Sequence, residues 1–173
     1  MDILSKVRDV PDFPIPGIMF KDITTLLADG EAFRQVIDGL EARYKNTGIT
    51  HVVGIESRGF LFGAPLADRL GIGFVPIRKK GKLPAKTREM SYALEYGEAI
   101  IEIHDDALKS GDRVVVLDDL LATGGTLKAS CDLIKECGAE IAEVWVLIEL
   151  AFLSGRAPLG DMKIHAEAIV TGE

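Results

Sequence analysis

Cysteine, histidine and tryptophan are scarce in this chain, and their scarcity limits its chemistry. There are 2 Cys, 3 His and 1 Trp in 173 residues. Cys131 and Cys137 lie six positions apart on an expected helix, so they cannot pair locally, and the spacing is not that of a zinc site. We therefore expect idle thiols in a reducing compartment, which indicates a cytoplasmic protein. The scattered histidines favour structural roles, and Trp145, inside an apolar strand, favours the core.

Long apolar runs and an excess of positive charge are also lacking. No apolar stretch approaches the length of a membrane span, and residues 1–6 do not have the layout of a secretion signal. The 20 Lys and Arg are outnumbered by 27 Asp and Glu, which gives a net charge of −7. We therefore expect no membrane and no nucleic-acid partner, because broad nucleic-acid binding needs a basic surface. An anionic ligand would need a local basic site.

Strand and helix patterns alternate along the chain. The apolar periodicity predicts strands at 51–56, 73–78, 114–117 and 142–150, helices at 31–45, 60–70 and 126–137, and an antiparallel hairpin over 91–104. This alternation predicts an α/β fold, with a mostly parallel sheet flanked by helices. In such sheets ligands bind beyond the carboxyl ends of the strands.

The length fits a single domain over residues 1–173. We expect an N-terminal segment at about 1–30, a core at 31–156 and a C-terminal tail at 157–173 whose role stays open. Three prolines in residues 10–18 exclude a helix or a central strand there.

The most informative segment runs from Val114 to Leu127 and reads Val-Val-Val-Leu-Asp-Asp-Leu-Leu-Ala-Thr-Gly-Gly-Thr-Leu. Its first four residues predict a strand buried on both faces, and Asp118 and Asp119 stand where that strand should end. A Gly-rich loop before a helix offers backbone N–H groups to a phosphate. The two carboxylates would repel that phosphate and suit hydroxyls or a cation, so the segment favours a phosphorylated sugar. The alternative is a plain βα turn, which is common in α/β domains.

Two more loops follow expected strands. Glu56-Ser57-Arg58-Gly59 precedes a helix, and Arg58 can grip a phosphate with two hydrogen bonds, although it could also be an ordinary surface arginine. Residues 78–82, Arg-Lys-Lys-Gly-Lys, form the densest positive cluster of an acidic chain, with a solvated basic loop as the alternative. Because all three loops follow strands of one sheet, we expect them to share one site.

These motifs together resemble those of the type I phosphoribosyltransferases, and residues 118–126 resemble the adenine phosphoribosyltransferases in particular. The likeness extends to about residue 156. It implies the type I phosphoribosyltransferase fold, with a small N-terminal hood and a flexible β-hairpin loop. It also implies a purine salvage enzyme, a glycosyltransferase that moves the 5-phosphoribosyl group of phosphoribosyl pyrophosphate (PRPP) to adenine, giving AMP and pyrophosphate. Two alternatives stay open: a purine or pyrimidine phosphoribosyltransferase with another base, and a PRPP-sensing regulator on the same fold.

The resemblance also implies roles for single residues. Those expected to be catalytic are Glu95, Asp118, Asp119 and Arg58. The 5-phosphate would be held by Ala122, Thr123, Gly124, Gly125 and Thr126. The pyrophosphate would be held by Ser57, Arg58, Arg78, Lys79 and Lys82. Mg²⁺ is expected to arrive with PRPP, and any contact with Asp118 or Asp119 would run through water, so no direct protein ligand is assigned.

The resemblance extends to a hood, a lid and a partner subunit. Residues 13–24 resemble the hood that recognises adenine, where Met19 and Lys21 meet the base edge and Phe20 stacks on the ring; a rigid N-terminal wrap is the alternative. Thr25 departs from the pattern, since many members have Pro there. Residues 83–97 resemble a mobile loop in which Glu95 transfers a proton and Tyr96 covers the site; a solvated hairpin charge is the alternative for Glu95. The Glu56–Ser57 bond is the expected cis peptide. A homodimer is expected, with Arg78 reaching toward the neighbour's site.

Overall fold

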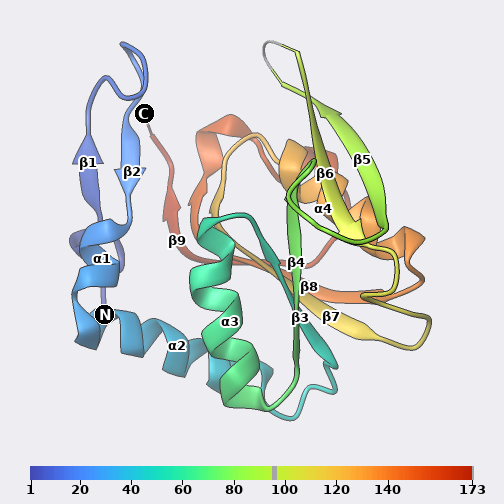
Figure 1. The fold of residues 1–173 in the computed structure, drawn as a ribbon. Helices are drawn as coiled ribbons and strands as arrows, with labels where there is room; N and C mark the ends of the chain where they lie inside the picture. Colours follow the sequence, from blue (N-terminus) through green and yellow to red (C-terminus); the bar gives the residue numbers. More distant parts are fainter. Residues whose placement is uncertain (95–96, 173) are drawn as a thin grey trace.

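A central sheet organises the computed structural model, which describes residues 1–94 and 97–172. Within these residues seven strands form one sheet in the order β5-β6-β4-β3-β7-β8-β9 (Figure 1). The strands are β3 (His51–Ile55), β4 (Gly73–Lys79), β5 (Thr87–Ala93), β6 (Glu98–His104), β7 (Arg113–Leu121), β8 (Glu140–Leu150) and β9 (Ile164–Val170). Strands β4, β3, β7, β8 and β9 pair in parallel, and the β5–β6 hairpin joins β4 antiparallel. The predicted α/β fold with a mostly parallel sheet is confirmed.

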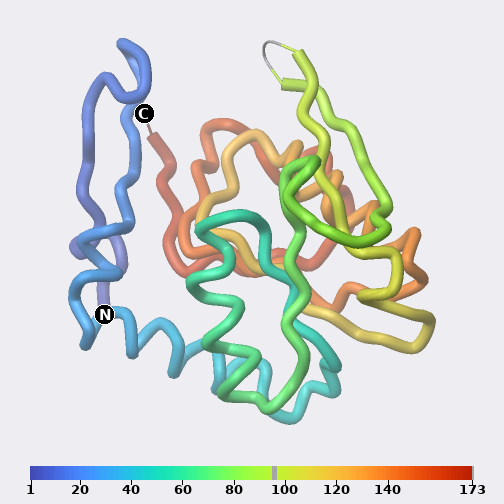
Figure 2. The backbone as a smooth tube through the Cα atoms, in the orientation of Figure 1, coloured from blue at the N-terminus to red at the C-terminus, as the bar shows by residue number. Residues whose placement is uncertain are grey.

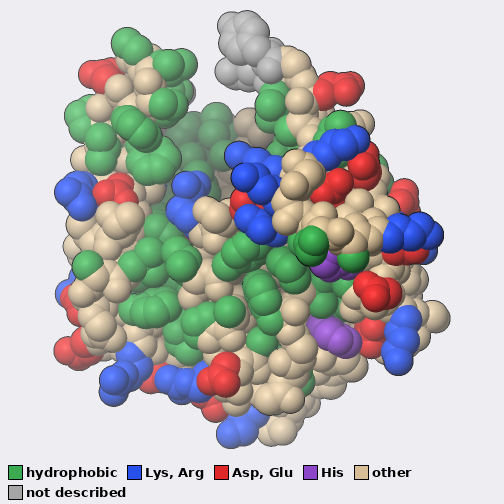
Figure 3. All heavy atoms as spheres, viewed as in Figure 1, with side chains coloured by type: hydrophobic (Ala, Val, Ile, Leu, Met, Phe, Trp, Pro, Cys, Tyr) green, Lys and Arg blue, Asp and Glu red, His purple; other side chains and the backbone are tan. Residues whose placement is uncertain are grey.

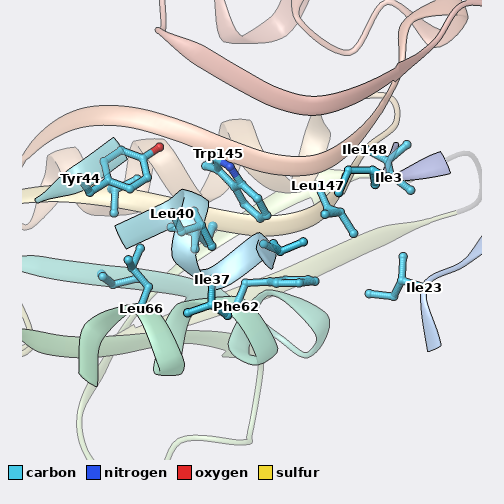
Figure 4. Close-up of a cluster of buried hydrophobic side chains, with 14 of the residues drawn as sticks. Ile3, Ile23, Ile37, Leu40, Tyr44, Phe62, Leu66, Trp145, Leu147 and Ile148 are labelled. Atoms are coloured by element: carbon cyan, nitrogen blue, oxygen red, sulfur yellow. The ribbon is translucent and has the colours of Figure 1, made fainter. Parts of the chain in front are cut away.

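Helices cover both faces of this sheet. They are needed there because successive apolar side chains along a strand point to opposite faces. Helices α2 (Gly30–Tyr44) and α3 (Arg58–Leu70) pack on the face that carries Val115, Leu117 and Trp145. Helix α4 (Gly125–Glu136) packs on the other face, against Val114 and Val116. Figure 4 shows the first cluster, in which the ring of Phe62 lies 5.5 Å from that of Trp145, between centroids. Trp145 is fully buried, so its prediction as a core residue is confirmed.

The N-terminal segment forms a small sheet of its own. Strands β1 (Arg8–Val10) and β2 (Phe20–Asp22) pair antiparallel, and helix α1 (Thr24–Ala28) follows. The prediction that residues 10–18 form no helix and no central strand is confirmed, since β1 and β2 are both edge strands. The prolines that motivated it lie in the loop between the two strands, where they interrupt no ladder. We call residues 1–28 the hood.

The hairpin predicted over 91–104 is confirmed, and it begins earlier, at Thr87. Residues 87–93 pair with β6 from Thr87 to Ala93, and Met90 and Tyr92 pack against the core on the α4 side. Glu95 and Tyr96 lie outside the described residues. In the tail, a short 3-10 helix (Ala157–Leu159) leads to β9, which extends the sheet beside β8. Figure 2 shows the hood and the hairpin rising at the same end of the molecule.

Strand β7 continues past the point predicted from its apolar run. Its ladder with β3 stops at Leu117, while its ladder with β8 continues to Leu121. Asp118 and Asp119 therefore lie inside the strand, and the prediction that it ends at residue 117 is wrong. The chain leaves β3 toward β4 on one side and reaches β8 from β7 on the other, so the sheet reverses its winding between β3 and β7. Such a reversal is where open α/β sheets bind ligands.

Membrane crossing has no support in the described part of the chain, where no helix combines the necessary length with the necessary apolar character.

Candidate active site

A cavity of about 360 Å³ opens beyond the carboxyl ends of β3 and β4, beside the last residues of β7. Its lining includes residues of all three loops singled out in the sequence, together with Ile55 of β3 and Tyr92 of β5. The lining residues are Ile55, Glu56, Ser57, Arg58, Lys79, Tyr92, Asp118, Asp119, Leu120 and Thr126. Figure 3 shows a hollow between the hood and the hairpin, with Lys and Arg side chains gathered at its edge. The expected convergence of the three loops is thus what the structure shows.

A smaller cavity of about 90 Å³ adjoins the first one. It is lined by Asp118 and by residues 120–127, so Asp118, Leu120 and Thr126 border both spaces. Gly124, with φ of 85°, turns the chain into helix α4 in a left-handed conformation that favours glycine. No described side chain caps this helix. Its first backbone N–H groups and its positive dipole end are therefore available to an anion.

A turn after β8, at Gly155, packs against the loop formed by residues 122–124. A Cβ atom at Gly124 would lie 2.2 Å from the carbonyl oxygen of Gly155, and one at Gly155 would lie 2.2 Å from the carbonyl oxygen of Ala122. Two backbone segments therefore touch where neither can carry a side chain. Arg156 fixes the turn by donating to Glu149 at 2.8 and 2.6 Å. The local residue pattern carries no sign of this contact.

The two neighbouring aspartates occupy different environments. Asp119 is buried, and its carboxylate accepts a hydrogen bond from the guanidinium of Arg58. The backbone N–H of Asp119 donates to the Asp118 carboxylate at 2.9 Å. Burial, and then the charge of Asp119, raise the pKa of Asp118 well above its ordinary value. The site therefore holds one carboxylate neutralised by an arginine beside one that resists ionisation.

Residues of the hood reach the cavity through Arg58. The Arg58 guanidinium lies 5.8 Å from the centroid of the Phe20 ring, a cation–π contact. Phe13 meets the edge of the same ring at 5.1 Å. The other two expected base contacts lie apart from this cavity: the side chain of Lys21 pairs with Asp9 at 2.6 Å, and Met19 lines a separate apolar cavity of about 340 Å³.

The cations of the basic loop, residues 78–82, fall into two groups, those with an ion-pair partner and those without one. Arg78 pairs with Glu56 at 3.2 Å, and Lys80 pairs with Glu89 at 2.8 Å. Burial alone would raise the pKa of Glu56, but hydrogen bonds from Arg78 and the Lys79 N–H outweigh it and lower that pKa. Lys79 lines the cavity. Among the described residues neither Lys79 nor Lys82 has an ion-pair partner, so these two charges remain available to an anion.

Two other features complete the site. Tyr92, to which the sequence assigns no role of its own, comes from the hairpin and lies 3.5 Å from where a Cβ of Gly125 would be. The described residues contain no group of three or more His, Cys, Asp or Glu that could hold a metal ion. Two neighbouring carboxylates beside a helix start that can bind an anion suit a Mg²⁺ ion that an anionic substrate brings with it. The Glu56–Ser57 peptide is cis, as predicted.

Comparison with known proteins gives concordant results. Residues 24–161 match the model of the phosphoribosyl transferase domain. The adenine phosphoribosyltransferase of Chloroflexus aurantiacus is 60% identical over 165 residues, which is 95% of each chain. The crystal structure of adenine phosphoribosyltransferase from Thermoanaerobacter pseudethanolicus superposes with a TM-score of 0.93, at 48% identity over 98% of both chains. The enzyme from Trypanosoma brucei, in complex with AMP, pyrophosphate and ribose-5-phosphate, gives 0.89 at 30% identity, over 96% of this chain and 78% of that one.

Proposed function

This chain belongs to the adenine phosphoribosyltransferase family, and from that premise we propose that its cavity transfers the phosphoribosyl group of PRPP to adenine, a purine salvage reaction that yields AMP and pyrophosphate. One observation carries the proposal. A pair of aspartates and two cations, Arg58 and the unpaired Lys79, meet in one cavity of about 360 Å³, which adjoins the small cavity at the start of α4. These three features match the three parts of PRPP: the 5-phosphate, the ribose and the pyrophosphate.

The 5-phosphate binds in the small cavity, at residues 122–126, which we call the phosphate loop. The N–H groups at the start of α4 donate to its oxygens, and the hydroxyls of Thr123 and Thr126 can donate as well. Asp118 and Asp119 bind the ribose hydroxyls, because carboxylates accept hydrogen bonds from hydroxyls and repel phosphate. Their position beside the ribose also stabilises positive charge that develops on the ring as its C1 loses pyrophosphate.

Pyrophosphate leaves toward Ser57, Arg58 and the basic loop. Lys79 lines the cavity, while Lys82 and Arg78 stand further out. The side chains that would face a Mg²⁺ ion are Asp118 and Asp119, through water or through the ribose hydroxyls. When bound, that ion would offset the negative charge of the leaving group.

Adenine lies under the hood. Phe20, whose ring already faces Arg58, stacks on the base, and the backbone groups of Met19 and Lys21 contact its edge. Adenine N9 attacks C1 as the bond from C1 to the pyrophosphate oxygen breaks, and Glu95, outside the described residues, takes the N9 proton. Closure of residues 83–97 excludes water that would hydrolyse PRPP, and Tyr96, also outside the described residues, is expected to cover the site.

The acidic character of the chain supports a homodimer, and its free thiols, Cys131 and Cys137, support a cytoplasmic location. A pyrophosphate group needs more cations than one subunit leaves unpaired near the cavity, and a partner's Arg78 would supply one. In the described structure Arg78 pairs with Glu56 of its own chain, so reaching a neighbour would require it to exchange that partner. A two-fold interface of about 1,200–2,000 Å² in total would be sufficient.

A pyrophosphate-release assay with PRPP and Mg²⁺, run with each base in turn, tests the function. Adenine should support turnover. Hypoxanthine and guanine should be slower by a factor of about 10⁴, since a site built for the 6-amino group leaves polar groups unpaired with a 6-oxo base. Comparable rates with hypoxanthine would overturn the base assignment. Specific binding to purine-gene DNA, without turnover, would instead favour a PRPP-sensing regulator.

A further inference from the structure

Glu102 is a buried carboxylate that the proposed reaction does not use. It lies in β6, at 4% exposure, and both of its oxygens accept hydrogen bonds. Oε2 accepts from the backbone N–H of Gly81 at 3.0 Å, and Oε1 accepts from the hydroxyl of Thr87 at 3.3 Å. A buried charge is costly unless it is paired and hydrogen-bonded, so its position calls for a reason.

The hydrogen bond from Gly81 is one of four in which every backbone N–H group from residue 79 to residue 82 of the basic loop finds an acceptor. The N–H of Lys79 donates to Glu56 at 2.9 Å, that of Lys80 to the carbonyl of Ile100 at 3.0 Å, and that of Lys82 to the carbonyl of Lys79 at 3.2 Å. Gly81 itself has φ of 83°, so its donor is held at the point where the basic loop turns left-handed. Two carboxylates, that of Glu56 just after β3 and that of Glu102 in β6, thus accept from alternate N–H groups of the loop.

This arrangement also determines which cations face the cavity. Lys80 is turned away and pairs with Glu89, which lies directly opposite Glu102 across the β5–β6 ladder. Like charges directly opposite each other destabilise a sheet. The repulsion between Glu89 and Glu102 therefore destabilises the hairpin at the position where Glu102 accepts from Gly81. Lys79, on the other side of the turn, lines the cavity and has no ion-pair partner among the described residues.

We propose that Glu102 is a positioning residue for the pyrophosphate subsite: by holding the Gly81 N–H it keeps the loop in the conformation that presents Lys79 to the cavity. The inference rests on the proposed function, because it takes pyrophosphate as the ligand of that loop. It goes beyond that function in assigning a role to a buried side chain that touches no substrate.

Calorimetric titration of the full-length protein with pyrophosphate plus Mg²⁺, and separately with AMP, tests the proposal. Glu102→Ala leaves the Gly81 N–H without its charged acceptor, so the affinity for pyrophosphate should fall about 10- to 100-fold. The affinity for AMP should stay within about twofold, since the phosphate loop is untouched. Glu102→Gln keeps an acceptor oxygen and should restore most of the pyrophosphate affinity. Glu136→Ala, the matched control, removes an exposed carboxylate at the far end of α4 and should change neither affinity.

The outcomes separate the two levels of the proposal. If the wild type turns over PRPP and adenine but Glu102→Ala binds pyrophosphate normally, the positioning role is wrong and the function stands. The positioning role is also wrong if both affinities fall together. A wild type that releases no pyrophosphate with adenine contradicts the proposed function itself. Should Glu102→Ala fail to fold, Glu102→Asp retains the charge but is too short to reach Gly81, and an unchanged pyrophosphate affinity in that variant overturns the positioning role.

Discussion

Adding one methyl group to the turn behind the phosphate loop should weaken AMP binding selectively. In Gly155→Ala the new Cβ atom would lie 2.2 Å from the carbonyl oxygen of Ala122 and 2.8 Å from a methyl carbon of Leu121. The leucine can change rotamer, but the carbonyl oxygen belongs to the backbone of the phosphate loop and can move only with that loop. The strain therefore reaches the residues that hold the 5-phosphate.

The size of the effect follows from the cost of overpacking. An extra carbon in a well-packed region costs about 1–3 kcal/mol, and about 1.4 kcal/mol corresponds to tenfold in affinity. If the loop relaxes by giving up its anion-binding geometry, AMP affinity should fall about 10- to 100-fold. Affinity for pyrophosphate, which binds on the other side of the aspartates, should change less than about threefold. Titration calorimetry with each product measures both.

Gly39→Ala is the matched control, because it adds the same methyl group to open space. Gly39 lies exposed inside helix α2, and a Cβ there would meet nothing within 4 Å. The variant should gain about 0.5–1 kcal/mol of stability and bind AMP normally. The reasoning is refuted if Gly155→Ala binds AMP as tightly as the wild type, or if it loses AMP and pyrophosphate in equal measure.

Three further predictions concern charge. Asp118→Asn should lower turnover about 10²- to 10³-fold while its melting temperature stays level or rises, because it removes a carboxylate whose pKa is raised by burial and by Asp119; a clear drop in melting temperature would contradict this. Burial would raise the pKa of Glu143, but hydrogen bonds from Arg43 and Tyr44 outweigh it and lower the pKa from 4.5 to about 2. The stabilisation is therefore complete above pH 4.5 and is lost as the pH falls toward 2; urea unfolding against pH should show this, and Glu143→Gln should flatten the slope. Finally, mixing Arg78→Ala with Asp118→Asn subunits should restore some activity if a dimer shares its sites, and sedimentation of a fully active monomer would exclude sharing.

The local sequence was most informative where an apolar run that predicts a strand is followed directly by residues that can bind a ligand. The apolar run from Val114 to Leu117 predicted a strand buried on both faces, and the small residues that follow predicted an anion loop. The strand's real end at Leu121 depended on β8, a partner that continues beyond β3 and leaves no mark on the local pattern. Pairing between distant segments decided that boundary.

Features built from backbone contacts were beyond sequence reasoning for a related reason. Gly155 reads as an ordinary turn glycine, and nothing in its neighbours points to Ala122, which lies far earlier in the chain. The hood strands are three residues each, too short to show a period of two. Residues 87–90 lie outside the hairpin predicted over 91–104, because only their pairing with β6 makes that segment part of strand β5.

The uneven ends of β3 and β7 have a consequence for how the substrate chamber could be resized. Helix α3 starts just beyond β3. A Cβ at Gly59 would lie 2.5 Å from the carbonyl oxygen of Leu117 in β7, so the first turn of the helix packs directly against β7. A larger residue at position 59 would lift that turn, and Arg58 with it, while the sheet kept its register. The distance between ribose and pyrophosphate subsites is therefore adjustable at a single position that contacts neither. Changing how closely the first turn of α3 packs against β7 could therefore accommodate a substrate with a longer or bulkier leaving group.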